Sequence, residues 1–138
     1  MRAVYEGIAY NIRWILQNFC KDYAIGCDDI RIIGGGALDK GWMQILSDVT
    51  GRKISVVENP RNAGAVGAAV VALIGLGELP SFADAKKFVR VSAVFQPIEA
   101  NRAVYDALFS QYQQLYHSLS GVYAAANGKR FTEEKAKA

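Results

Sequence analysis

The chain has 138 residues, of which 51% are hydrophobic and 21% are charged, a composition typical of one compact globular domain and not of a disordered segment. Its 16 basic and 13 acidic residues give a net charge of +3. This excess of positive charge is too small and too scattered to indicate nucleic-acid binding. The longest apolar run, residues 63–76, is interrupted by glycines and is shorter than the roughly 20 residues of a membrane-spanning helix, so no membrane partner is predicted.

The first 20 residues predict an amphipathic helix with one apolar face. The residues of this face recur every three or four positions: Tyr5, Ile8, Ile12, Ile15, Leu16 and Phe19. Glu6, Arg13 and Asn18 interrupt the unbroken apolar stretch that a signal peptide requires. Because no capping residue precedes the helix, we expect the chain to begin partway through a larger protein.

Two cysteines and one histidine limit the chemistry that the chain can perform. Cys20 and Cys27 match no zinc or redox spacing, and His117 is the only histidine. The sequence therefore predicts no metal site and disfavours a histidine-based catalytic triad. We expect two reduced thiols in a cytoplasmic protein, with a structural disulfide as the alternative.

Residues 30–75 predict a strand–helix–strand–helix unit. Strands are expected at 30–33 and 53–58, and helices from about 39 to 50 and from 63 to about 75. Gly51 is expected to follow the end of the first helix, and Asn62 to cap the second. Such a unit implies two parallel strands with a right-handed crossover.

The remainder of the chain is expected to be helical. A short amphipathic segment spans 82–90, and Pro97 precedes a longer helix from about 99 to 126. The apolar positions of that helix are Val104, Leu108, Tyr112, Leu115, Leu119 and Val122. A polar tail from Lys129 to Lys137 is expected to fray.

The glycine-rich turn Gly34–Ala37, between a strand and a helix, is the strongest candidate for a binding site. Glycine allows a positive φ and lets a ligand approach the backbone closely. Ligands of parallel sheets bind at the carboxyl ends of strands, and the N–H groups of the next helix favour a polar or anionic group. A P-loop is excluded because Lys40-Gly41 has the wrong order. A tight turn that binds no ligand explains the glycines equally well.

The dinucleotide fingerprint G-x-G-x-x-G is matched only in part. Gly34 and Gly36 fit it, but Asp39 occupies the third position, where a small residue allows the helix to pack on the strand. Glu58 lies about where a ribose-binding acid is expected. A dinucleotide-binding domain of an oxidoreductase therefore stays an alternative function.

Residues 63–69 form a face of small side chains that includes Gly64 and Gly67. A glycine inside a helix costs roughly 1 kcal/mol relative to alanine. We therefore expect a close neighbour at this face, most simply the sheet or another helix, and otherwise the flat face of a ligand. An assembly module without catalytic activity is accordingly a third function class.

Several segments, in order, resemble the C-terminal domain of the FGGY carbohydrate kinases, especially the xylulokinase-like branch. They lie at residues 3–10, 32–37, 42–51, 56–58 and 63–69. The resemblance covers residues 2 to about 78, and Phe95-Gln96-Pro97 with the tyrosine-rich helix after it is similar to the family's usual ending. It implies an α/β fold, the C-terminal part of an actin-like, ribonuclease-H-like ATPase domain. The chain would then be a single partial domain over 1–138, with a core at about 2–78, helices at about 82–126 and a flexible tail at 127–138.

The resemblance also implies a function. The parent protein would be an ATP-dependent kinase that uses Mg²⁺ and phosphorylates a sugar hydroxyl, with a pentulose such as D-xylulose as substrate. In the family the glycine-rich loop lies against adenine and ribose, which assigns nucleotide binding to Gly34, Gly35, Gly36 and Ala37, with Asp39 as a polar contact beside the adenine.

The same resemblance places the catalytic Asp and the phosphate loop outside these residues. No catalytic residue is therefore expected in this chain, and the chain alone is expected to be inactive. The implied partners are the N-terminal sugar-binding domain of the same protein, the sugar and, in a homodimer, a second copy.

Overall fold

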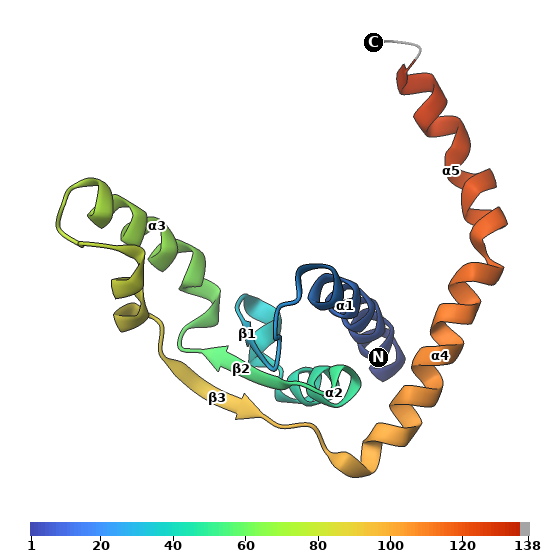
Figure 1. The fold of residues 1–138 in the computed structure, drawn as a ribbon, viewed down its shortest axis with the longest axis horizontal. Coiled ribbons are helices and arrows are strands. Elements are labelled where there is room, and N and C mark those ends of the chain that lie inside the picture. Colours follow the sequence, from blue (N-terminus) through green and yellow to red (C-terminus); the bar gives the residue numbers. More distant parts are fainter. Residues whose placement is uncertain (136–138) are drawn as a thin grey trace. The chain divides into compact units, whose positions relative to one another are not determined.

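The computed structural model describes the backbone of residues 1–135 and the side chains of residues 1–127. It divides into two compact units, Met1–Arg102 and the residues from Ala103 onward. The first unit contains three helices and three strands: α1 (Arg2–Tyr23), β1 (Asp29–Ile32), α2 (Lys40–Thr50), β2 (Lys53–Val57), α3 (Ala63–Gly75) and β3 (Val91–Phe95) (Figure 1). The second unit contains most of α4 (Arg102–Ser118) and all of α5 (Ser120–Lys135).

The sheet has the strand order β1-β2-β3. β1 and β2 are parallel, with Ile30 opposite Ile54, which confirms the predicted parallel pair. β3 runs antiparallel to β2, with Phe95 opposite Ile54. The prediction that residues after 82 are helical was therefore wrong for 91–95, where valines and a phenylalanine suit a pleated strand.

The core of the first unit lies between α2 and β2. Met43 and Val49 of α2 and Ile54 of β2 are completely buried. The buried hydroxyl of Ser47 lies 2.8 Å from the Arg52 carbonyl oxygen, so this polar group in the core has a partner. Gly51 follows the helix with φ 66°, as predicted, because glycine adopts this left-handed conformation without strain.

Helix α1 packs against α2 through a different face from the one predicted. Ala9, Tyr10 and Arg13 are its buried residues, whereas Ile8 and Ile15 are 46% and 58% exposed. The side chain of Arg13 reaches the end of α2, where its Nη1 donates to the Val49 carbonyl oxygen at 3.1 Å. The buried face therefore centres on Ala9, Tyr10 and Arg13, while Ile8 and Ile15 of the predicted face remain exposed.

Helix α3 has the predicted bounds, and Asn62 precedes it without a side-chain capping hydrogen bond. The expected close neighbour of its small-residue face is absent from the described part of the chain. A Cβ added at Gly64 or Gly67 would meet no heavy atom within 4 Å. The prediction of tight packing at this face is therefore wrong for this chain.

Replacing Gly67 with leucine is expected to raise the free energy of unfolding of this chain, by up to about 0.8 kcal/mol, because leucine has the higher helix propensity. Within the described residues, no heavy atom lies within 4 Å of the Cβ of the new side chain. Urea unfolding of Gly67→Leu beside the parent measures the change. A loss of more than about 1 kcal/mol, as overpacking produces, would contradict the open face.

The predicted long helix after Pro97 is divided. A short 3-10 turn, Glu99–Asn101, precedes α4, and a turn at Leu119 separates α4 from α5. Several residues of the predicted apolar face are exposed, among them Val104 at 60% and Leu115 at 58%. The segment predicted as a tail is helical as far as Lys135, and residues 136–138 lie outside the described residues.

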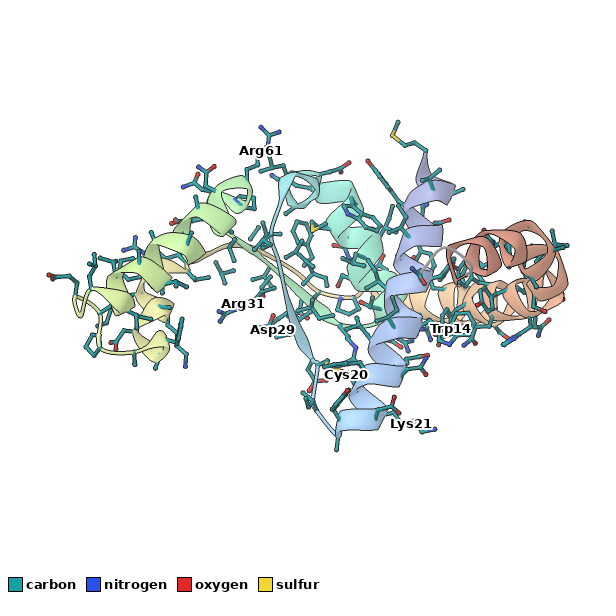
Figure 2. All side chains as sticks on the ribbon, turned by 90° about the horizontal axis from the view of Figure 1, so that it is seen from above. Trp14, Cys20, Lys21, Asp29, Arg31 and Arg61 are labelled. Carbon is teal, nitrogen blue, oxygen red and sulfur yellow. A yellow bond between two sulfur atoms is a disulfide. The ribbon has the colours of Figure 1, made fainter. Side chains whose placement is uncertain are left out.

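The structure joins Cys20 and Cys27 in a disulfide, so the prediction of two reduced thiols was wrong (Figure 2). Ala24, at the end of α1, has the left-handed φ of 51° that turns the chain back on itself. This turn brings the Cα atoms of the two cysteines to 6.6 Å, within the range that a disulfide spans. Among the described helices, none is long and apolar enough to cross a membrane.

Candidate functional site

The glycine-rich turn lies at the carboxyl edge of the parallel strands. Gly34 is separated from the end of β1 by one residue, Ile33. It adopts φ 93° and ψ 176°, a conformation that is essentially restricted to glycine. Its N–H donates to the Pro60 carbonyl oxygen at 2.7 Å. Because Pro60 lies in the turn after β2, this hydrogen bond holds the two turns side by side at one edge of the sheet.

Gly35 and Gly36 do not have the positive φ that restricts position 34 to glycine. Gly35 and Gly36 begin a 3-10 turn that ends at Leu38. A Cβ on Gly35 would lie 3.8 Å from Arg61 Nε, and one on Gly36 would lie 3.7 Å from Trp42 Nε1. Both are ordinary van der Waals distances, so a Cβ would fit at both positions. The packing of the chain therefore explains Gly34 and leaves Gly35 and Gly36 unexplained.

Asp39 connects this turn to α2 and to α1. Its Oδ1 accepts a hydrogen bond from the Trp42 N–H at 3.1 Å, which caps the N-terminus of α2. Its Oδ2 accepts from the Tyr5 hydroxyl at 3.0 Å. The rings of Tyr5 and Trp42 lie with their centroids 5.0 Å apart. Three elements therefore hold this carboxylate in a fixed position beside the glycines.

These contacts shift the acidity of both side chains. The Trp42 N–H and then the Tyr5 hydroxyl hold the pKa of Asp39 below its usual value, and the same carboxylate raises the pKa of Tyr5. Because its pKa is lowered in the folded state, Asp39 favours folding at neutral pH. This contribution is lost as the pH falls through the lowered pKa.

A cavity of about 330 Å³ adjoins the turn. Its lining comes from the residues after β1 and β2 and from β3: Leu38, Asn59, Pro60, Arg61, Asn62 and Ser92. Figure 2 shows Arg61 at this edge of the fold. One guanidinium group and two amide side chains can hydrogen-bond polar or anionic groups of a ligand.

Glu58, the expected ribose-binding acid of the dinucleotide alternative, lines a different cavity. That cavity has a volume of about 430 Å³ and is mostly apolar, with Val66, Val70, Phe82 and Phe88 among its residues. Gly34, Gly35 and Gly36 do not line it. The structure thus does not bring the two parts of the dinucleotide fingerprint to one cavity.

Sequence reasoning missed two contributors to this edge, Tyr5 and Arg61. Tyr5 was assigned to the apolar face of a helix, and only its 3.0 Å contact with Asp39 shows its polar role. Arg61 stands between Pro60 and Asn62 without any recognisable motif. Among the described residues, no group of three or more His, Cys, Asp or Glu side chains is placed to hold a metal ion.

Comparisons with known proteins agree on one family. Residues 1–76 match the C-terminal domain of the FGGY family of carbohydrate kinases. The xylulose kinase of Bacillus subtilis is 31% identical over 117 residues, which cover 84% of this chain and 23% of that protein.

Two solved structures extend the comparison. The xylulose kinase of Rhodospirillum rubrum matches with a TM-score of 0.70 and 31% identity, over 88% of this chain and 25% of that one. The glycerol kinase of Plasmodium falciparum with ADP matches with a TM-score of 0.68 and 27% identity, over 82% of this chain and 23% of that one. The chain therefore spans about a quarter of the length of each of these relatives.

Proposed function

Because the chain belongs to the FGGY family of carbohydrate kinases, whose C-terminal domain matches residues 1–76, we propose that it forms the nucleotide-binding side of an ATP-dependent sugar kinase. Its fold is the actin-like ATPase fold of the family's solved structures. The full enzyme would transfer the γ-phosphoryl group of ATP to a hydroxyl group of a sugar.

The observation that carries the proposal is the pair Gly35 and Gly36. The described part of the chain leaves room for a Cβ at both positions, so the glycines are best explained by a ligand that lies against the backbone. Adenine and ribose are flat or compact enough to do so. Gly34 and Ala37 complete the turn, and Asp39 is proposed as the polar contact beside the adenine. A related glycerol kinase was solved with ADP, which supports this class of ligand.

The chemistry needs groups that this chain does not bring together. Phosphoryl transfer depends on positioning and on charge stabilisation around Mg²⁺. Since the described residues form no cluster that could hold a metal ion, Mg²⁺ is proposed to arrive with the phosphates of ATP. An N-terminal sugar-binding domain of the same protein would supply the catalytic base and the sugar site.

Exposed apolar surface on α1 supports the proposed further domain. Val4, Ile15 and Phe19 are 62%, 58% and 46% exposed, and neither the sheet nor α2 covers them. The outer edge of β1 has no partner strand among the described residues. The preceding part of the intact kinase is proposed to cover both surfaces.

The substrate, the compartment and the assembly of the intact enzyme are further parts of the proposal. A pentulose such as D-xylulose is proposed, because xylulose kinases from Bacillus subtilis and Rhodospirillum rubrum are each 31% identical. The cytoplasm is proposed as the compartment, because ATP is available there. A homodimer is proposed as the assembly of the intact enzyme.

Replacing Gly36 with valine in the intact kinase is expected to raise the KM for ATP by about tenfold, as a clash of one to two kcal/mol would. The KM for the sugar should stay within about twofold, because the change affects only nucleotide binding. Steady-state kinetics with each substrate varied measures both constants.

Gly64→Val is the matched control, because a Cβ at Gly64, like one at Gly36, clashes with no described atom of the chain, and Gly64 lies in α3, away from the turn. It should leave both constants unchanged. A Gly36→Val enzyme with an altered KM for sugar and an unaltered KM for ATP would count against the assignment of the turn.

A further inference from the structure

A second polar cavity, of about 250 Å³, lies at the opposite edge of the sheet from the glycine-rich turn. Asp28, which precedes β1, and Arg52, which precedes β2, both line it. Since the two strands are parallel, the residues before them share the amino edge, whereas Gly34 and Pro60 follow them at the carboxyl edge. This cavity is therefore separate from the proposed nucleotide site.

Three guanidinium groups line the cavity, from Arg13, Arg52 and Arg102. Arginine stays protonated at all ordinary pH values. Among the described residues that line the cavity, Asp28 alone carries a carboxylate, which is fully exposed and lies 3.7 Å from Arg52 Nη1. The charged side chains that line the cavity, three arginines and one aspartate, thus sum to +2. The whole chain has a net charge of +3, so positive charge is concentrated at this cavity.

Two of the arginines, Arg13 and Arg52, donate hydrogen bonds to backbone carbonyl oxygens, and Arg102 lies against the backbone at Gly51. Arg13 is only 7% exposed, and its Nη1 donates to the Val49 carbonyl oxygen at 3.1 Å. Arg52 Nη1 donates to the Cys27 carbonyl oxygen. The guanidinium of Arg102 lies directly over Gly51, so that a Cβ on this residue would collide with it. These contacts fix the positions of the charges before any ligand binds, which lowers the entropy lost on binding.

We propose that this cavity binds the phosphate group of a small anionic ligand. Guanidinium groups match the oxygens of phosphate with paired hydrogen bonds. A tetrahedral phosphate presents its oxygens in several directions and can meet three guanidinium groups at once, whereas a planar carboxylate presents only two oxygens. The proposal does not depend on the nucleotide site, because it concerns the other edge of the sheet.

Titration of the ¹⁵N-labelled 138-residue chain with inorganic phosphate tests the proposal. We expect saturable shifts of the backbone amide resonances of Gly51 and Arg52, and weaker binding of acetate. Arg102→Gln should weaken phosphate binding by about tenfold, the loss expected when one charge-assisted hydrogen bond is removed. Arg52→Gln provides the same comparison if Arg102→Gln does not fold.

Arg90→Gln is the matched control, since it removes one positive charge from an exposed position elsewhere in the first unit. It should bind phosphate like the parent. The proposal is overturned if phosphate gives no saturable shifts, if the shifts map to residues 34–39 instead, if acetate binds as tightly, or if Arg90→Gln loses as much affinity as Arg102→Gln.

Discussion

The 138-residue chain alone is expected to show no transfer of phosphate from ATP to any sugar. A general base must lie within hydrogen-bond reach of the hydroxyl that it deprotonates. Asp39, the carboxylate fixed beside the glycine-rich turn, is already hydrogen-bonded to the Trp42 N–H and the Tyr5 hydroxyl. Glu58 lines a mostly apolar cavity that the turn does not share. Neither is placed to act as the base.

The loss of the second substrate site makes the expected effect large. Holding two reactants in the correct geometry can lower a barrier by up to roughly 7–11 kcal/mol, and a chain that binds only the nucleotide provides none of it. A coupled assay with ATP, Mg²⁺ and a panel of pentuloses measures turnover, with the intact kinase as the positive control. Turnover above the blank by the pure chain would contradict the proposal that the catalytic base and the sugar site lie in another domain.

Replacing Asp48 with alanine is expected to destabilise the chain by about 3 kcal/mol, the cost of removing a buried carboxylate that accepts three part-buried hydrogen bonds. Asp48 lies in α2 and is 4% exposed. Its Oδ1 accepts from the Ile98 N–H at 2.8 Å, and its Oδ2 accepts from Asn101 Nδ2 at 2.8 Å. Gln44 Nε2 donates to the same Oδ1. This carboxylate therefore fastens the segment after β3 to α2.

Urea unfolding followed by circular dichroism measures the change. Asp28→Ala is the matched control, because the Asp28 side chain is fully exposed and its ion pair with Arg52 is long at 3.7 Å. It should change the free energy of unfolding by less than about 0.5 kcal/mol. An Asp48→Ala chain as stable as Asp28→Ala would show that the three hydrogen bonds contribute little.

The end of α2, the bounds of α3 and the pairing of β1 with β2 could be predicted from the local sequence. Gly51 ends α2 because only a residue that tolerates positive φ can follow the helix there, and its φ is 66°. The bounds of α3 follow from the small, helix-compatible residues between Asn62 and Leu76. The parallel pairing of β1 and β2 followed from the strand–helix–strand order.

Features that depend on distant partners could not be predicted in the same way. The strand at 91–95 forms because β2 offers a free edge about 40 residues earlier in the chain. The periodicity of α1 predicted the helix but not its buried face. That face contains Ala9, Tyr10 and Arg13, and it depends on how α1 packs on α2. The Asp48 contacts join residues 50 and 53 positions apart, and no local pattern signals them.

The candidate site also has a part that the local sequence predicts and a part that depends on distant contacts. The glycine-rich turn was identifiable because Gly34–Gly36 separates a strand from a helix. The contribution of Tyr5 was not, because a hydrogen bond between residues 34 positions apart depends on the packing of α1 on α2. The disulfide likewise depended on the left-handed Ala24, whose conformation a single alanine does not reveal.

Nucleotide titration of the ¹⁵N-labelled chain tests the central claim most directly. ADP and NAD are added separately, and the backbone amide resonances of residues 34–39 are followed. Saturable shifts are expected at these residues with ADP, and NAD should bind no more tightly than ADP, since no contact with the nicotinamide is expected. Absence of shifts at residues 34–39 at millimolar ADP, or clearly tighter binding of NAD, would contradict the central claim.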